Sequence, residues 1–416
     1  MNDDTLLYKT PDAMEPLFPS DSKGILENLA VELIKKSARL SGTMNPTTRK
    51  ALADFLRPMN SYYSNLIEGH DTHPIDIARA LQNEYSEDKK KRNLQKEAHA
   101  HIKLYEEIGI EIKTQNSDII PSSSKYLKSI HKRFYEHLPE DFKQVKSVEG
   151  TIKHIIPGEL RIDEIEIGRH LGPFSKSLPL FMDRFENFYD PKNNSNKLKV
   201  KRIISIAASH HRLAWIHPFL DGNGRVIRLY SDACFIFEEL DSLGLWSISR
   251  GLARRSEEYK SKLANADLKR YNDYDGRGNL SDKMLIEFCT FFLETAIDQV
   301  NYMYKILDVE NMLSRIDKFV NLMVIKDKLR LEAKYILSDV FLKGKITKSE
   351  AMRITNTSDK TLKIIIDKLI KMELITAKKE SINMVYYVKY PMKYSPMLFP
   401  GIYPSDKETE MIGDLI

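Results

Sequence analysis

The sequence predicts a mainly α-helical protein that ends in a small module of helices followed by strands. Apolar residues recur at helical spacing in several long segments, which include 25–41, 200–215 and 280–322. After residue 330 the pattern changes to three short helical segments and then two runs of strand-forming residues. Hydrophobic residues make up 42% of the 416 residues, so a buried core can form, and the length favours two or three domains.

Composition and charge exclude several classes of protein. A net charge of +5 is too small to argue by itself for nucleic-acid binding. The two cysteines, Cys234 and Cys289, give neither a disulfide framework nor a metal-ligand spacing, which favours a reducing compartment. The sequence has no apolar run of about 18 residues and no signal-peptide pattern at its start. We therefore expect a cytoplasmic protein that makes no use of a membrane.

One loop concentrates residues that suit phosphate binding. Residues 217–228 read HPFLDGNGRVIR, between a helix that ends just before His217 and a second helix that begins near Arg225. The Gly-Asn-Gly turn lets backbone N–H groups converge, and the start of a helix adds N–H donors and a positive dipole end. Arg225 and Arg228 are three residues apart and share a helix face, so both guanidinium groups can hold phosphate oxygens.

The same loop carries two residues suited to catalysis. Asp221 offers a hard oxygen ligand for a phosphate-bound Mg²⁺ ion. His217 lies at the mouth of the loop, and its ordinary pKa of ~6.5 suits a general base that acts on a hydroxyl group. Each of these pieces alone is more often an ordinary helix stop or loop. No packing requirement explains a base, a carboxylate, a glycine nest and two arginines within one turn.

This segment resembles the signature of the Fic family, His-Pro-Phe-x-Asp/Glu-Gly-Asn-Gly-Arg-x-x-Arg, and it fills every fixed position. The resemblance implies a protein adenylyltransferase that uses ATP and Mg²⁺. His217 would deprotonate a Ser, Thr or Tyr hydroxyl of a target protein, which attacks the α-phosphate of ATP as pyrophosphate leaves. Asp221 would bind the metal. Five positions would bind the phosphates of ATP: Gly222, Asn223, Gly224, Arg225 and Arg228.

A second motif lies far upstream, where residues 64–69 read SNLIEG. Ser64 and Glu68 are four residues apart on one helix face, and Gly69 suits a helix C-terminus. The stretch resembles the family's inhibitory motif, Ser/Thr-x-x-x-Glu-Gly/Asn, in the class whose inhibitory helix precedes the Fic core. The resemblance implies a bidentate pair between Glu68 and Arg228 that misaligns ATP. Taken alone, Glu68 would be read as a solvated residue, and a role in removing AMP from the target stays open.

Two further features resemble parts of the family. Residues 157–168 (PGELRIDEIEIG) are expected to form a short hairpin similar to the flap that aligns the target by strand addition. The positions that mark this flap are Pro157, Gly158, Ile165 and Gly168. Tyr259 resembles the tyrosine of the adenine pocket. The alternatives are an ordinary surface hairpin and a half-buried helix tyrosine.

The C-terminal module has the order helix, helix, helix, strand, strand, which is typical of a winged helix. Thr347 is expected to cap its second helix, with Glu350 three residues later. The third helix, residues 361–372, is lysine-rich, which is compatible with docking in the major groove of DNA. Its lysines, together with the one just before it, are Lys360, Lys363, Lys368 and Lys371. Exposed lysines are also common on solvated faces, and winged helices also bind proteins.

We therefore predict a Fic-type helical bundle with a small β-hairpin flap, followed by a winged-helix domain. The expected regions are an N-terminal helical region (1–110, with the inhibitory helix around 60–69), a Fic catalytic core (111–325), a winged helix (330–392) and an irregular tail (393–416).

Two other functions compete with a regulated enzyme. One is a DNA-binding transcriptional regulator whose Fic domain senses nucleotide, although a sensor has no need of His217. The other is a toxin that requires a separate antitoxin, although Glu68 already supplies a brake within the chain. The resemblance also implies a homodimer and a protein target that carries a hydroxyl side chain, including the chain itself.

Overall fold

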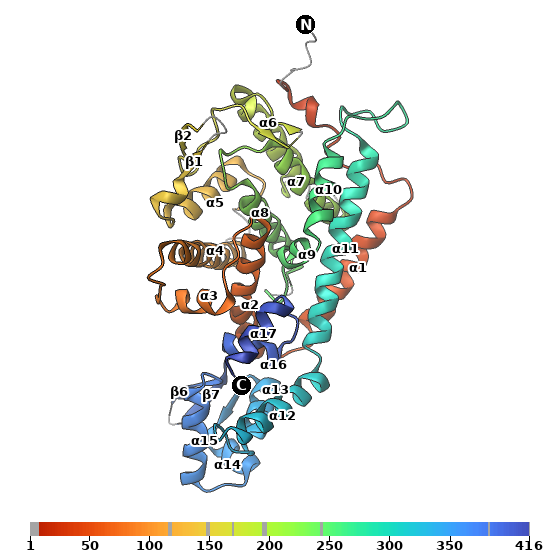
Figure 1. Cartoon of the computed structure of the whole chain (residues 1–416). Helices are drawn as coiled ribbons and strands as arrows, with labels where there is room; N and C mark the ends of the chain where they lie inside the picture. Colours follow the sequence, from red (N-terminus) through yellow and green to blue (C-terminus); the bar gives the residue numbers. More distant parts are fainter. Residues whose placement is uncertain are drawn as a thin grey trace.

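The computed structural model describes residues 8–114, 119–146, 150–168, 170–193, 198–241, 244–381 and 383–415. These parts of the chain form a mainly helical protein, as the sequence predicts, and they also contain three small antiparallel sheets (Figure 1). Among these residues, we find no helix with both the length and the apolar character that crossing a bilayer requires.

The N-terminal region supplies the helix that carries the inhibitory motif. Its helices are η1 (Pro11–Met14), α1 (Ile25–Ser41), α2 (Pro46–Ile67), α3 (Pro74–Leu81) and α4 (Lys89–Thr114). Helix α2 begins where expected, because the Asn45 side chain accepts a hydrogen bond from the Thr47 N–H and Pro46 fills the first turn. It ends in a Schellman motif in which Gly69 takes a φ of +84° and the His70 N–H donates to the Asn65 carbonyl.

The central region places two buried helices side by side. Its helices are α5 (Ser124–Glu136), η2 (Glu140–Lys143), η3 (Ser175–Ser177), α6 (Leu178–Tyr189), α7 (Lys199–Ile216), α8 (Asn223–Phe237), α9 (Ile248–Arg254), α10 (Ser256–Ala266), α11 (Asp282–Ile306) and α12 (Val309–Ile325). Helices α7 and α8 are buried along most of their lengths, with α4, α6 and α11 packed around them. Because the phosphate-binding motif joins α7 to α8, its loop is held at both ends by the core.

The expected hairpin over residues 157–168 is wrong. The strands of this region are β1 (Gln144–Lys146), β2 (Ile152–His154), β3 (Glu166–Ile167) and β4 (His170–Leu171), and they pair as β1 with β2 and β3 with β4. Residues 157–165 contain no strand, because this backbone bonds to the core instead of pairing with itself: the Arg161 N–H donates to the Pro218 carbonyl at 2.9 Å.

The C-terminal module contains the expected three helices and two strands, and a further short strand. Its elements are α13 (Ala333–Lys343), β5 (Lys345–Thr347), α14 (Lys348–Thr355), α15 (Asp359–Lys371), β6 (Ile375–Glu380) and β7 (Asn383–Val388). The antiparallel sheet has the order β5-β7-β6. Thr347 and Glu350 form the expected capping box. Strand β5 has only three residues, which is too short to leave a periodic signal in the sequence.

The expected irregular tail is also wrong. The segment folds into η4 (Met392–Tyr394), α16 (Ser395–Leu398) and α17 (Ser405–Gly413), and α16 and α17 lie against the lower part of α2 (Figure 1). Tyr403 is buried and packs edge-on against Tyr62 of α2, with 5.4 Å between ring centroids. The Tyr63 hydroxyl donates to the Ile402 carbonyl at 2.9 Å. These helices are short and interrupted by Pro and Gly, so tertiary packing rather than local periodicity defines them.

Replacing Tyr403 by Ala is expected to lower the free energy of unfolding by about 3 kcal/mol, because it leaves a cavity where an aromatic ring was fully buried. Chemical denaturation of the full chain measures this change. Tyr274→Ala is the matched control, since the Tyr274 side chain is 100% exposed and its loss should change little. Equal stabilities of the two variants would contradict the packed tail.

Candidate active site

The loop of the motif is shaped by its own residues. His217 follows the last turn of α7 with a left-handed φ of +48°, which turns the chain out of the helix. Phe219 is fully buried and anchors the loop. The Asn223 side chain accepts from the Phe219 N–H at 2.9 Å and donates to the Phe219 carbonyl at 2.8 Å. Both polar groups of this side chain therefore shape the loop, and phosphate binding by Asn223 stays a prediction.

Both glycines of the turn sit where a side chain has no room. Gly222 has a φ of +78°, and a Cβ atom there would lie 2.7 Å from the ring of Tyr135. Gly224 lies in the first turn of α8, where a Cβ atom would collide with the carboxylate of Glu68 and lie 3.1 Å from Nη1 of Arg228. The first turn of α8, a natural anion site, thus has a carboxylate in contact with it.

Asp221 offers a partly exposed carboxylate at the mouth of the loop. Its side chain is 46% exposed, accepts a hydrogen bond from the Tyr135 hydroxyl at 2.9 Å and lies 3.6 Å from Nη2 of Arg225. The described residues contain no group of three or more His, Cys, Asp or Glu side chains arranged to hold a metal by themselves. This arrangement fits Mg²⁺, which proteins often hold through one carboxylate while nucleotide phosphates supply other ligands.

His217 is held in the neutral form. Burial, together with the electrostatic influence of Arg161 and His170, lowers the pKa of His217 to about 3. A neutral imidazole has one ring nitrogen with a free lone pair, and that nitrogen can accept a proton.

Arg161 supports the backbone of His217, a role that the sequence analysis did not predict. The Arg161 side chain is fully buried, and its three terminal groups donate to three carbonyls: Nε to His217 at 2.9 Å, Nη1 to Asp163 at 2.8 Å and Nη2 to Pro173 at 2.7 Å. It therefore ties the segment after Pro157 to the backbone of the motif. An arginine in a polar turn carries no sequence signal that separates this role from a solvated one.

His131 of α5 makes a second link that the sequence analysis missed. Its Nδ1 accepts from the Gly158 N–H at 2.8 Å, so Nε2 carries the proton and donates to the Asp221 carbonyl at 3.2 Å. The ring stacks on Phe219 with centroids 4.1 Å apart. Of the expected flap positions, Pro157 and Gly158 thus lie beside the motif.

The other two flap positions, Ile165 and Gly168, lie later in the chain and in other contacts. Ile165 accepts the Gly172 N–H through its carbonyl, and Gly168, with a φ of +64°, belongs to the turn between β3 and β4.

Arg225 has a buried partner that the sequence did not predict. It forms an ion pair with Glu97 of α4, whose side chain is 0% exposed and whose second oxygen lies 2.7 Å from Nδ1 of His70. This hydrogen bond raises the pKa of His70. The carboxylate of Glu97 therefore neutralises the charge of Arg225, which is not an unpaired cation in this structure.

The expected contact between the two motifs is present. Nη2 of Arg228 donates to Oε1 of Glu68 at 2.6 Å, while Nε donates to Oγ of Ser64 at 3.0 Å. The pairing differs from the expected bidentate one, since only one guanidinium nitrogen bonds to Glu68. Burial opposes ionisation of Glu68, but Arg228 and then Arg225 outweigh it, and the pKa of Glu68 is lowered.

Tyr259 of α10 does not line an open adenine pocket. Its residue is 4% exposed, and its hydroxyl lies 2.7 Å from Nε2 of His210. The enclosed ring leaves little surface on which a base can stack, and the adenine role of Tyr259 stays a prediction.

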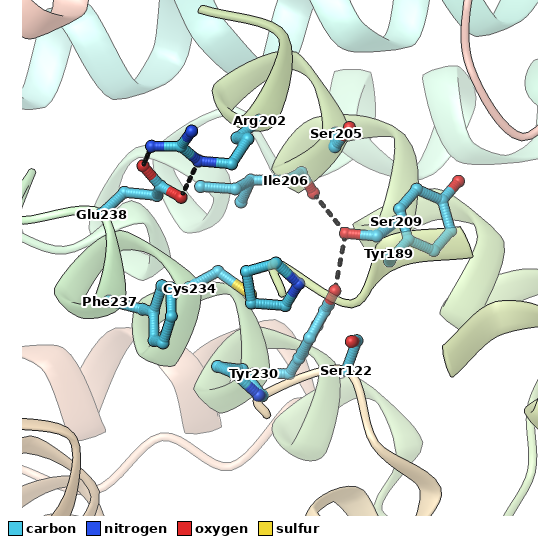
Figure 2. A pocket seen from close by; sticks show the side chains of 12 residues that line it. Ser122, Tyr189, Arg202, Ser205, Ile206, Ser209, Tyr230, Cys234, Phe237 and Glu238 are labelled. Carbon is cyan, nitrogen blue, oxygen red and sulfur yellow. Dashed lines mark hydrogen bonds and ion pairs between the residues drawn. The ribbon is translucent and has the colours of Figure 1, made fainter. Parts of the chain in front are cut away.

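A separate small pocket lies between α7 and α8 and the chain around Ser122 (Figure 2). Arg202 and Glu238 close one side through two hydrogen bonds of 2.7 and 3.0 Å. The Tyr230 hydroxyl donates to Ser209 at 2.8 Å within it. None of residues 217–228 lines this pocket, so it is distinct from the motif.

Residues 121–234 match the sequence model of the Fic/DOC family. The chain contains a Fic domain. It is related to curated proteins named "Protein adenylyltransferase Fic", with 34% identity over 106 residues in Drosophila mojavensis and 37% over 84 residues in Drosophila ananassae. These matches cover 25% and 20% of this chain but only 20% and 16% of the relatives, so they span about a fifth of those proteins or less.

Solved structures extend the likeness in fold beyond the Fic domain. A Fic family protein from Desulfovibrio desulfuricans G20 superposes with a TM-score of 0.51 at 15% identity, covering 90% of this chain and 98% of that one. Fic-1 from C. elegans superposes with a TM-score of 0.51 at 14% identity, covering 68% and 72%. The chain therefore has a Fic-like fold over most of its length.

Because its pKa is lowered, the imidazole of His217 is expected to stay neutral down to a pH well below the ordinary midpoint of ~6.5. NMR of the histidine-labelled protein should show no titration of His217 between pH 8 and about pH 5, and His217→Gln identifies its signal. A midpoint at or above 6.5 would contradict the enclosed, cation-flanked ring.

Proposed function

We propose that this chain is a protein adenylyltransferase that transfers AMP from ATP to a Ser, Thr or Tyr hydroxyl of a protein. The observation that carries the proposal is the placement of His217 at the end of α7, directly before the glycine turn and the first helical turn of α8, with Arg225 and Arg228 on that helix. The names of the curated relatives agree with this chemistry.

In the reaction, His217 accepts the proton of the target hydroxyl as its oxygen bonds to the α-phosphorus of ATP. The bond from that phosphorus to the bridging oxygen breaks, and pyrophosphate leaves. The first turn of α8 and the arginines orient the triphosphate. Asp221 would hold Mg²⁺, which supplies charge neutralisation on the phosphates when bound. Arg161 and His131 hold the catalytic loop in place through hydrogen bonds to its backbone carbonyls.

The target would dock at the segment after β2. A groove there is lined by Ile156, Leu160, Ile162 and Leu220 among others, and Ile162 is 87% exposed. This groove lies beside Arg161, which bonds to His217. Exposed apolar side chains on an irregular backbone suit a target segment that adds as a strand.

We further propose that Glu68 inhibits transfer. Its carboxylate contacts both Gly224 and Arg228, where the terminal phosphate of a productively bound ATP would lie. Glu68 also caps the C-terminus of α2, where the helix dipole disfavours a negative charge. The contact is partly exposed, with 32% of the Glu68 side chain accessible, so its strength is modest and the inhibition is reversible. A role for Glu68 in AMP removal stays a prediction.

For residues 330–392 we propose a winged helix. Several of its basic groups bond within the protein, including Lys368 to the Asp327 carbonyl, Lys345 to Glu380 and Lys348 to Asp359. These pairs leave less free positive charge for DNA than the sequence alone implied. DNA binding, the transcriptional-regulator alternative and a homodimer therefore stay predictions, and the enzyme is the function proposed.

Glu68→Gly is expected to raise the rate of AMP transfer at least tenfold, because removing the carboxylate frees Arg228 for the triphosphate; about 1.4 kcal/mol suffices for a tenfold change. Mass spectrometry of a lysate incubated with ATP and the variant measures the added AMP.

Two controls frame this experiment. Glu239→Gly removes an exposed glutamate at a positive φ and should leave the rate unchanged. Adding His217→Ala to Glu68→Gly should abolish transfer. An unchanged rate for Glu68→Gly would reject the inhibitory role, and transfer that survives His217→Ala would reject the proposed base.

A further inference from the structure

His70 lies just beyond the end of α2, two residues after Glu68. Its backbone N–H donates to the Asn65 carbonyl at 3.0 Å and so closes the C-terminal cap of the helix. Its side chain reaches across to α4, where Nδ1 donates to Oε2 of Glu97 at 2.7 Å. His70 therefore connects the end of α2, which carries Glu68, to a second helix.

Glu97 holds His70 firmly because both of its oxygens have partners and its side chain is enclosed. Oε1 pairs with Nη1 of Arg225 on α8, while Oε2 accepts from His70. The Glu97 side chain is 0% exposed, so water cannot readily replace a partner that leaves. A buried carboxylate oxygen that loses its hydrogen bond costs free energy, because nothing then offsets its desolvation. The structure therefore opposes the separation of His70 from Glu97.

The contacts of Glu68 and His70 act on one short segment. The two residues are two positions apart, so their Cα atoms lie at most about 7 Å from each other. Both are joined to the same helix, α8: Glu68 through Arg228, and His70 through Glu97 and Arg225. Glu68 cannot move far from Arg228 without drawing His70 away from Glu97. Release of the Glu68 carboxylate therefore breaks both contacts.

The surroundings of the His70 ring favour its charged form. The ring of Phe142 in η2 meets it edge-on, with 6.2 Å between ring centroids, and 34% of the His70 side chain stays exposed to solvent. The charged groups that act on the imidazole are Glu97 of α4, Arg225 of α8 and Glu68 at the end of α2. The hydrogen bond to Glu97 raises the pKa of His70, so protonation of the ring strengthens this contact.

We propose that His70 is a second inhibitory residue: by holding the end of α2 to Glu97, it keeps Glu68 on Arg228 and so keeps transfer slow. This inference rests on the proposed function, because it concerns the regulation of the same site. His70 is a positioning residue in this role, since it acts through Glu68 and needs no contact with the nucleotide or the target. A signal that draws His70 away from Glu97 would release the inhibition.

The test measures AMP transfer by the full chain, with and without Glu68. His70→Phe keeps a flat ring and removes the hydrogen-bond donor. With Glu68 present, this variant is expected to transfer AMP about threefold to tenfold faster, the effect of losing one partly exposed hydrogen bond to a charged group. In the Glu68→Gly background the same substitution should change the rate less than about twofold, because the residue that His70 positions is already gone. His70→Asn, which can still donate to Glu97, should keep most of the inhibition.

A pH profile gives a second readout, one that a merely structural role would not move. The contact is strongest while His70 is charged, and it weakens as the pH rises through the raised pKa, above ~6.5. The rate of the unsubstituted chain, divided by that of Glu68→Gly at the same pH, should therefore rise between about pH 6 and pH 9. The same ratio should stay flat for His70→Asn, whose side chain does not titrate.

A control and a structural measurement separate the possible outcomes. His137→Phe alters an exposed histidine at the end of α5 and should change no rate. Amide hydrogen exchange of residues 66–72 should be faster in His70→Phe than in the unsubstituted chain, whatever the activity. An equal gain in rate with and without Glu68, no gain in either background, or unchanged exchange would overturn the role of His70. Absence of transfer by Glu68→Gly itself would instead reject the proposed function.

Discussion

The contact between Glu68 and Arg228 is the constraint on which the rest of the site depends. Arg228 is buried in the middle of α8, where an unpaired guanidinium is costly, so it must always have an anionic partner or several acceptors. Here the partner is a carboxylate from a distant part of the chain, placed over the one glycine that leaves it room. In the proposed function a triphosphate is the other partner, and it would compete with Glu68 for the same donors.

Helix α2 brings that carboxylate into place from outside the Fic domain. Its 22 residues span roughly 33 Å at 1.5 Å per residue. Near its start, Thr48 donates to the Phe341 carbonyl of α13 at 2.7 Å, and near its end Tyr62 and Tyr63 pack under the C-terminal tail. The position of Glu68 is therefore set by contacts with the C-terminal module and the tail as well as by Arg228.

The sequence predicted what depends on local chemistry. The end of α7 before His217, the start of α8, the capping box at Thr347 and the end of α2 at Gly69 all follow from residues within one turn of each feature. The pairing of Glu68 with Arg228 followed only from the family resemblance, since 160 residues separate the two residues. The residues that hold the site in place were not predicted from the sequence. Glu97, His131 and Arg161 act through neighbours that are distant in sequence, and isolated polar residues carry no periodic signal.

The most direct test of this account is the structure of the Glu68→Gly variant with ATP and Mg²⁺ bound. We predict that the Arg228 guanidinium, still held by Ser64, contacts the terminal phosphate where the Glu68 carboxylate lay, with the ring of His217 facing the α-phosphate. A nucleotide bound with its terminal phosphate away from Arg228, or with its α-phosphate out of reach of His217, would contradict it.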